Sequence, residues 1–437
     1  MNDELQRVER AATKRKVGSF YYDQNTYSFI MVNMIARALS LVAFSEDWGR
    51  QMRFVTGPRQ SGKTTLARAQ LRQTHCEALY MLWDLRSIRQ RYKTDELFFT
   101  ADFPATIAQP WACLDEIHKM PKWKNILKGL FDALDGRCRL IVTGSAKLDI
   151  LRQAGDSLAG RYFTFHLHPV TLAELAGHGS ALAACPTLAQ EFLQARADAR
   201  PTATAALDQL LRFSGFPEPL LNARTAFHRK WAGDYIESVI REDIGTLTRI
   251  VDREHLHDLY HLLPETVGSS LSMTSLGGHL QVSPVTVKNY LRRLDDFFLT
   301  FSVRPFTRNI KRSLVKAPKF YLYDWTRIAD PGHRFENYVA CELLSRVRLW
   351  TDVTGLVFDL YYVRNKQKQE TDFLITRARD PWLLIEAKLS DQPVEGHHLA
   401  TAEALGTIPL VQVCRQSGVA VAQRERVFRM SADRLFG

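Results

Sequence analysis

The chain has 437 residues, of which 46% are hydrophobic and 24% charged, and its formal net charge is +11 at pH 7. This length exceeds one ordinary core and favours two to four domains. The composition is that of a soluble globular protein, and apolar runs such as residues 111–114 are far too short to cross a bilayer, so we expect no membrane association. The polar start has no apolar core directly behind its basic residues, which argues against a secretory signal and predicts a cytoplasmic protein.

Cysteine and histidine spacing gives no sign of zinc or disulfide chemistry. The six cysteines are scattered without a C-x-x-C pair, and Cys113 and Cys138 lie in or near strands that we expect to be buried. His257 and His261 are four residues apart but lack a third ligand at a helical or strand spacing. We interpret the cysteines as reduced core residues and the two histidines as part of a solvated helix face.

The first chemical motif along the chain is a complete G-x-x-x-x-G-K-[ST] loop. It lies between an apolar strand at residues 52–55 and a helix that starts near Thr65. Glycines let the backbone N–H groups face a β-phosphate, the lysine reaches the β and γ oxygens, and the final hydroxyl holds Mg²⁺. We therefore predict an ATP and Mg²⁺ site made of Gly57, Pro58, Arg59, Gln60, Ser61, Gly62, Lys63, Thr64 and Thr65.

After the loop, apolar segments alternate with helical stretches, which predicts a mostly parallel sheet. The strand at residues 111–114 ends in Asp115 and Glu116. At the carboxyl end of a parallel strand, Asp115 would hold Mg²⁺ through water and Glu116 would polarise the attacking water. The next strand, residues 140–142, ends in Thr143-Gly144-Ser145, and we assign Ser145 to contact the γ-phosphate or orient the water.

The loop, the acid pair and the polar residue after the following strand come in the order of the AAA-type ATPases, which this segment resembles. The resemblance implies ATP hydrolysis by a homo-oligomer, with a ring of about six subunits expected. It also implies a role for Arg161, which precedes the next strand: an arginine at this place stabilises γ-phosphate charge in the neighbouring subunit. The alternative for Arg161 is a surface arginine at the start of a strand.

The middle of the chain predicts a winged helix. A helical region at residues 225–263 precedes two short helices joined by Gln281-Val282-Ser283. Ser283 would cap the second helix and Pro284 suits its first position. Residues 297–305 and 319–323 have strand character and would form the wing. Apolar residues of the second helix repeat with helical spacing: Val287, Tyr290, Leu291 and Leu294.

Basic residues are concentrated on this predicted recognition helix and wing. Nine lie between Pro284 and Lys319 against two aspartates, so this stretch supplies 9 − 2 = +7. Such a patch is typical of a polyanion partner, and we expect DNA. A winged helix can also serve protein–protein contacts, and a solvated charged face is the simpler alternative. We assign the DNA contacts to Lys288, Arg292, Arg293, Lys311 and Arg312.

The last part of the chain carries paired acids on predicted strands. Side chains alternate along a strand, so Glu386 and Lys388 point to one face, and Asp372 would lie on the adjacent strand. Two carboxylates on one divalent ion, with a lysine to orient or activate water, suit phosphodiester hydrolysis. Glu336, on a helical stretch at residues 334–349, could complete the acidic cluster.

The order Glu336, Asp372, Glu386, Lys388 resembles the PD-(D/E)XK nuclease superfamily, which implies a second Mg²⁺ or Mn²⁺ site. The alternative is a nuclease-derived fold kept for binding or assembly. With Gly215-Phe216-Pro217-Glu218-Pro219 and Ala387-Lys388-Leu389-Ser390, the arrangement from about residue 50 to 415 resembles a widespread prokaryotic family. Its members are AAA ATPases with a C-terminal nuclease-like domain of unknown function.

We therefore expect an α/β chain with five segments: an N-terminal extension (1–48), an AAA-type ATPase domain with a parallel sheet (49–170), a helical lid and linker (171–262), a winged helix (263–325) and a PD-(D/E)XK nuclease-like α/β domain (326–437). The expected function is an oligomeric ATPase that binds DNA and remodels it or moves along it. Two alternatives are a nucleotide-controlled switch that recognises a protein partner and an ATP-regulated, metal-dependent nuclease.

Overall fold

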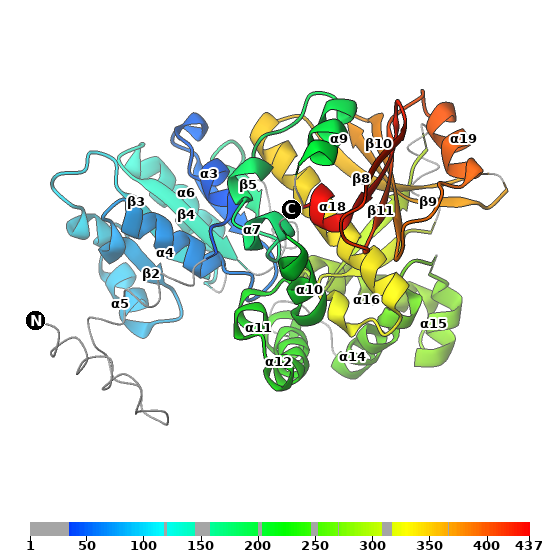
Figure 1. Ribbon diagram of the computed structural model, residues 1–437. Coiled ribbons are helices and arrows are strands. Elements are labelled where there is room, and N and C mark those ends of the chain that lie inside the picture. Colours follow the sequence, from blue (N-terminus) through cyan, green and yellow to red (C-terminus); the bar gives the residue numbers. More distant parts are fainter. Residues whose placement is uncertain are drawn as a thin grey trace, which may run out of the picture. The chain divides into compact units, whose positions relative to one another are not determined.

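Figure 1 shows a computed structural model of the chain. The structure describes residues 35–117, 120–144, 158–199, 203–245, 252–269, 271–307, 317–365 and 367–437. From Ala36 to Gly437 the chain forms one compact unit. Three predicted site residues, Ser145, Lys311 and Arg312, lie outside the described residues.

The first sheet has five strands, and every neighbouring pair in it is parallel. The strand order is β2-β3-β4-β1-β5, so β4 lies between the strand that leads into the phosphate loop and the strand that ends in the acid pair. The strands are β1 (Met52–Thr56), β2 (Tyr80–Leu82), β3 (Trp111–Asp115), β4 (Arg139–Gly144) and β5 (Tyr162–His166). This arrangement confirms the predicted α/β architecture with a parallel sheet.

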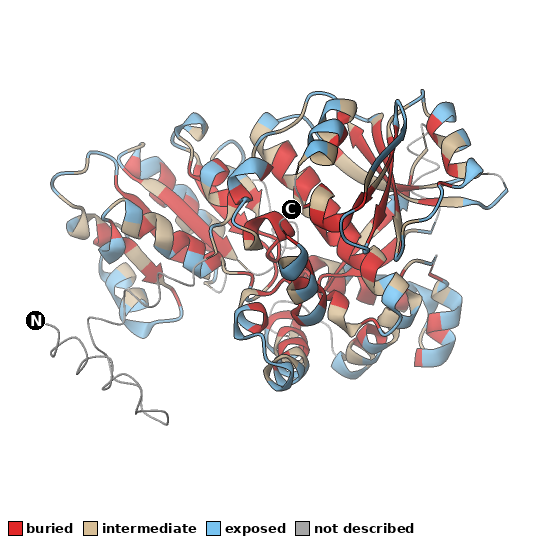
Figure 2. Cartoon of the chain, in the orientation of Figure 1, coloured by how far each residue is buried: buried red, intermediate tan, exposed pale blue. Residues whose placement is uncertain are grey.

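Strands β1 and β3 are buried along their whole length, as expected of parallel strands covered on both faces. Figure 2 shows buried residues concentrated on the strands and on the inner faces of the helices. The helices and short 3-10 turns of this part are α3 (Ala38–Ala43), η1 (Glu46–Trp48), α4 (Lys63–Gln73), η2 (Glu77–Leu79), α5 (Arg86–Thr94), η3 (Phe98–Asp102) and α6 (Trp123–Leu134).

A run of helices follows β5. At its centre, α11 and α12 are held together by stacked and tilted aromatic rings of Phe216, Trp231 and Tyr235, with ring centroids 4.9 to 5.1 Å apart. The elements are α7 (Leu172–Leu175), α8 (Gly179–Leu182), α9 (Ala189–Asp198), α10 (Thr204–Phe213), α11 (Pro217–Asn222), α12 (Thr225–Ser238), the π-helix η6 (Val239–Ile244), α14 (Arg253–Leu262) and the 3-10 turn η7 (Leu263–Thr266).

Helices α15 (Met273–Leu280) and α16 (Pro284–Asp296) are the predicted helix-turn-helix pair. The Thr286 N–H donates to Ser283 Oγ at 3.1 Å, and Pro284 occupies the first turn. The predicted apolar residues of α16 are buried. Strand β6 (Thr300–Pro305) pairs antiparallel with β7 (Lys319–Leu322), but β6 also pairs in parallel with β8 through Arg304 and Tyr361. The strands expected to form a wing are thus the edge of a larger sheet.

That larger sheet is mixed, with eight strands in the order β12-β13-β11-β10-β9-β8-β6-β7. Its remaining strands are β8 (Phe358–Arg364), β9 (Glu370–Arg377), β10 (Asp380–Lys388), β11 (Leu410–Cys414), β12 (Ala420–Arg424) and β13 (Val427–Ser431). Helices and turns of this part are η8 (Trp325–Arg327), α18 (Pro331–Thr354), α19 (Gly396–Ala404) and α20 (Ala432–Leu435).

Helix α18 connects the two sheets, since it contacts β8 and β10 of the second sheet and β5 of the first. Its start is set by Asp330, whose carboxylate accepts the His333 N–H at 2.8 Å, and by Pro331 in the first turn. The Leu172 N–H donates to the buried carboxylate of Glu342 at 2.7 Å, which ties α7 to α18.

All six cysteines are free and five are buried, as the sequence predicted; Cys185 is half-buried. No helix within the described ranges is both long and apolar enough to span a membrane.

Candidate functional site

The phosphate loop leaves β1 and runs into α4, so its backbone is fixed at both ends. Gly57 passes so close to the Leu167 backbone that a Cβ there would collide with the Leu167 carbonyl oxygen. Gly62 has φ 98°, in the left-handed region that favours glycine. Both glycines of the motif are therefore required by the local backbone as well as by a phosphate ligand.

Lys63 is buried and folded back onto the loop, where its Nζ donates to the carbonyls of Gly57 at 3.0 Å and Pro58 at 2.7 Å. Burial lowers the pKa of Lys63 to about 8, although Glu116 and Asp115 act to raise it. A phosphate in the loop would compete with these two carbonyls for the ammonium group.

The structure brings together Asp115 and Thr64, the two residues assigned to Mg²⁺. The Thr64 hydroxyl donates to Asp115 Oδ2 at 2.9 Å, although the two residues are 51 positions apart. Two further hydroxyls, of Tyr80 on β2 and Thr143 on β4, donate to the same carboxylate. A hydroxyl and a carboxylate are the hard oxygen donors that suit Mg²⁺, so this pair fits the predicted ion.

Glu116 follows Asp115 at the end of β3 and has φ 60°. This left-handed backbone is disfavoured for a residue with a side chain. The Glu116 carboxylate acts to raise the pKa values of both Lys63 and Arg59, so it lies within electrostatic reach of the loop. The acid pair and the loop therefore meet at one edge of the first sheet.

Two residues between the glycines of the loop, Arg59 and Gln60, are held by contacts that no sequence pattern predicted. Arg59 forms ion pairs of 2.8 Å with Asp243 and with Glu242, both on the π-helix η6. The Trp231 indole N–H donates to Gln60 Oε1 at 2.5 Å. Burial acts to lower the pKa of Arg59, but Asp243 and Glu242 raise it above its ordinary value. These partners lie more than 170 positions from the loop, so no local pattern could reveal them.

Arg161 does not join the nucleotide site of its own chain. Its guanidinium makes two hydrogen bonds, of 3.0 and 3.1 Å, to the Asp132 carboxylate. The Met52 N–H donates to the Arg161 carbonyl, which places Arg161 beside the first residue of β1, at the opposite end of that strand from the loop.

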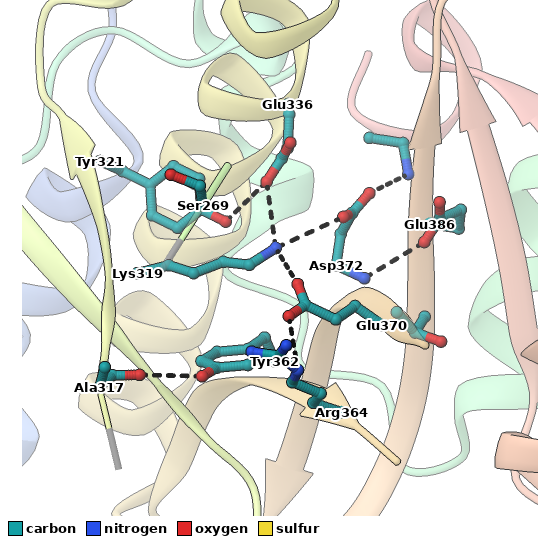
Figure 3. Close-up of polar contacts among 12 residues, drawn as sticks. Ser269, Ala317, Lys319, Tyr321, Glu336, Tyr362, Arg364, Glu370, Asp372 and Glu386 are labelled. Carbon is teal, nitrogen blue, oxygen red and sulfur yellow. Dashed lines mark hydrogen bonds and ion pairs between the residues drawn. The ribbon is translucent and has the colours of Figure 1, made fainter. Parts of the chain in front are cut away.

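The C-terminal acids lie close together, as Figure 3 shows. The Asp372 N–H on β9 donates to Glu386 Oε2 on β10 at 3.2 Å, and the Ala387 N–H donates to Asp372 Oδ2 at 3.0 Å. Lys388 Nζ lies 2.9 Å from Glu386 Oε1. Burial and the charge of Asp372 raise the pKa of Glu386 to about 8. Two carboxylates and one lysine thus share one face of the second sheet.

Lys319 lies inside this acidic cluster, which corrects its assignment to the basic surface. Its side chain is 2% exposed, and its Nζ lies 3.1 Å from Glu370 Oε2, 3.8 Å from Glu336 Oε1 and 3.9 Å from Asp372 Oδ1. Burial and then Asp372 raise the pKa of Glu336 to about 7, while Lys319 acts to lower it. Neither Lys319 nor Glu370 was among the predicted site residues.

The residues assigned to DNA divide into two groups. Lys288 and Arg292 are exposed and lie four residues apart on α16, so they share one helical face. Arg293 is half-buried and pairs with Asp296 at 3.4 Å. Among the described residues, the basic surface available to DNA therefore consists of the outer face of α16 and the exposed Arg304 on β6.

The parallel sheet, the phosphate loop and the paired acids define a P-loop ATPase domain. Comparison with protein families agrees: an AAA domain matches residues 49–176. The AAA match and the parallel sheet agree on a P-loop fold for the first folded part of the chain. Two further matches are to domains of unknown function, DUF8612 at residues 204–326 and DUF4143 at residues 331–429.

Three relatives that match this chain carry the name uncharacterized protein. Proteins of Mycobacterium bovis and Mycobacterium tuberculosis are each 24% identical over 350 residues, which cover 75% of this chain and 68% of theirs. A Haemophilus influenzae protein is 22% identical over 318 residues, covering 68% of this chain and 74% of its own.

Two solved structures align partially. The Orc1 protein of Aeropyrum pernix in complex with DNA has 14% identity and a TM-score of 0.30, with 75% of this chain and 95% of that chain covered. The Drosophila ORC bound to DNA has 12% identity and a TM-score of 0.26, with 64% and 89% covered. At such TM-scores these likenesses do not establish a common fold.

Proposed function

We propose that this chain hydrolyses ATP with Mg²⁺. The observation that carries the proposal is the contact between Thr64 and Asp115 beside Lys63. Thr64 and Asp115 would hold the ion, Lys63 would neutralise the β and γ oxygens, and Glu116 would polarise the attacking water. Thr143, which donates to Asp115, would keep that carboxylate oriented. Phosphate release that requires both ATP and Mg²⁺ tests the proposal.

We further propose that nucleotide binding is relayed to a DNA-binding surface. Arg59 and Gln60 of the loop already contact η6 and α12, so a ligand that draws these side chains away would alter the helical region. The exposed Lys288 and Arg292 on α16 supply the positive charge that a phosphate backbone needs. Remodelling of DNA, or movement along it, is the use of ATP that this arrangement favours.

DNA binding is expected to weaken when Lys288 and Arg292 are both replaced by alanine. Each lost phosphate contact removes one counterion release, so the slope of log affinity against log salt should flatten by about one unit per residue. Fluorescence anisotropy with a labelled duplex over a salt series measures both quantities. Lys128 and Lys230, on α6 and α12, serve as a control pair of equal charge. Unchanged affinity and slope would favour the switch that recognises a protein partner.

Hydrolysis is expected to require a homo-oligomeric ring in which Arg161 acts on the neighbouring subunit. Arg161→Ala should then lower turnover about a thousandfold or more, because phosphoryl transfer depends on charge stabilisation. Mixing Arg161→Ala with Glu116→Gln subunits should restore part of the activity at interfaces with two intact halves. Asp132→Ala is the matched control, since it breaks the same ion pair but keeps the guanidinium. Equal losses in both variants would assign Arg161 a structural role.

The convergence of Asp372, Glu386 and Lys388 favours a second candidate function, metal-dependent cleavage of DNA. Asp372→Asn and Lys388→Met should each lower Mg²⁺- or Mn²⁺-dependent cleavage about a hundredfold or more, while ATP turnover survives. Asp380→Asn, at the exposed start of β10, is the control. Wild-type protein that cleaves no form of DNA with either metal would leave the fold a binding role only.

A further inference from the structure

Two adjacent histidines, His397 and His398, lie in the first turn of α19, which follows Lys388 along the chain. Glu395 immediately precedes the helix, His397 is half-buried and the His398 side chain is 1% exposed. One ligand atom from each of these three residues can be chosen so that all lie within 4.8 Å of one another. No sequence pattern singles out these residues, because two neighbouring histidines follow no helical or strand ligand spacing.

One ring nitrogen of each histidine already has a hydrogen-bond partner in the protein. His397 Nε2 lies 3.2 Å from the Glu370 carbonyl oxygen, which can only accept, so this nitrogen carries the proton. His398 Nδ1 lies 2.8 Å from the Thr371 hydroxyl. Histidines that bind metals are oriented in this way, with one ring nitrogen hydrogen-bonded to the protein and the other left for the ion. The nitrogens left here are His397 Nδ1 and His398 Nε2.

Each of these two nitrogens faces a carboxylate oxygen, and only the first of these carboxylates, that of Glu395, belongs to the group whose ligand atoms lie within 4.8 Å of one another. His397 Nδ1 lies 3.4 Å from Glu395 Oε2, and His398 Nε2 lies 3.5 Å from Glu386 Oε1. Ligands of a tetrahedral zinc ion are about 3.3 Å apart when each bond is about 2.0 to 2.1 Å long. His398 Nε2 is buried and makes no hydrogen bond to any residue that the structure describes. This buried ring nitrogen and the Glu386 carboxylate oxygen face each other without a hydrogen bond, an arrangement that a cation between them would satisfy.

We propose that Glu395, His397 and His398 bind a divalent transition-metal ion of the zinc type at the start of α19. Two imidazoles and a carboxylate favour Zn²⁺ or Co²⁺ over Mg²⁺, which prefers oxygen ligands alone. The set leaves one position open, on the side of Glu386. This site borders the Asp372–Glu386 pair but uses different ligands, and it does not depend on DNA cleavage.

The Lys388 ammonium and the positive end of the α19 dipole both weaken binding of a cation at this site. Lys388 Nζ lies 3.6 Å from Glu395 Oε1 as well as 2.9 Å from Glu386 Oε1, so it competes for both carboxylates. The positive end of the α19 dipole also disfavours a cation. The affinity must therefore come from the direct bonds to Glu395 and the two imidazoles, and removing the Lys388 charge should strengthen it.

The test is titration of the full-length protein with Zn²⁺ by calorimetry and with Co²⁺ by absorption spectroscopy. A background variant, His257→Ala/His261→Ala, first removes the histidine pair on α14, whose Nε2 atoms lie 3.2 Å apart and would bind metal weakly. In that background we expect one Zn²⁺ site per chain that depends on the two histidines, and a Co²⁺ spectrum of low coordination number. His397→Gln and His398→Asn place an amide where the hydrogen-bonded ring nitrogen was, Nε2 of His397 or Nδ1 of His398. Both variants remove the ring nitrogen that would bind the ion. Each should weaken binding at least tenfold, whereas Lys388→Met should strengthen it.

Two controls separate this site from its neighbours and from misfolding. Asp372→Asn should leave Zn²⁺ affinity within about twofold, and circular dichroism with thermal unfolding checks that each variant is folded. Unchanged affinity in folded His397→Gln and His398→Asn would overturn the proposal. The proposal would also be overturned if Asp372→Asn lost Zn²⁺ binding while the two histidine variants kept it, because the ion would then belong to the acidic cluster.

Discussion

Lys63→Ala is expected to abolish ATP binding, whereas Glu116→Gln should keep binding and stop turnover. Lys63 supplies the buried ammonium at the loop, and without it the β and γ oxygens lose that direct counterion. Glutamine at position 116 keeps the shape and hydrogen-bonding capacity of the side chain but cannot accept the proton of the attacking water. General-base contributions are about 10²- to 10⁴-fold, so turnover should fall by that factor.

Nucleotide titration by calorimetry and phosphate release under saturating ATP separate the two effects. Glu77→Gln is the matched control, because Glu77 is an exposed glutamate beside β2, in the same sheet but away from the loop. It should bind and hydrolyse ATP as the unmodified protein does. Wild-type turnover in Glu116→Gln would show that another group polarises the water, and ATP binding retained by Lys63→Ala would remove the loop lysine from the proposed site.

Lys319→Met is expected to destabilise the chain by about 3 to 5 kcal/mol at pH 8, because it leaves three buried or half-buried carboxylates without their shared counterion. Part of this loss should be regained on acidification. The pKa of Glu336 is already raised by burial to about 7, and removing Lys319 raises it further. A carboxyl whose pKa is higher in the folded state contributes stability at low pH that is lost as the pH rises through that pKa.

Urea unfolding at pH 5.5 and at pH 8 measures this prediction. The difference between Lys319→Met and the unmodified protein should be larger at pH 8, and adding Glu336→Gln should recover part of it. Lys288→Met removes an exposed lysine and should change stability by less than about 0.5 kcal/mol. A loss in Lys319→Met that is equal at both pH values would mean that packing, and not charge, is what Lys319 supplies.

Local sequence patterns predict the elements whose causes lie within a few positions along the chain. The loop at residues 57–64, the acids after β3 and the Ser283 cap with Pro284 were all read from spacing and residue type, and the structure contains the corresponding strands and helices. The alternation that placed Glu386 and Lys388 on one face is likewise a property of any strand. Such features depend on neighbours within a few positions, which a sequence displays directly.

Which distant charges meet depends on how the strands pair and the helices pack. The sequence counted Lys319 as part of a basic surface, yet the pairing of β7 with β6, and of β6 with β8, carries it into the acidic cluster beside Asp372 and Glu370. Likewise, the contact of Arg59 with Asp243 and the approach of His398 to Glu386 depend on strand order and helix packing. The physical reason is that a charge is buried or exposed according to its partners in space, which chain spacing alone does not specify.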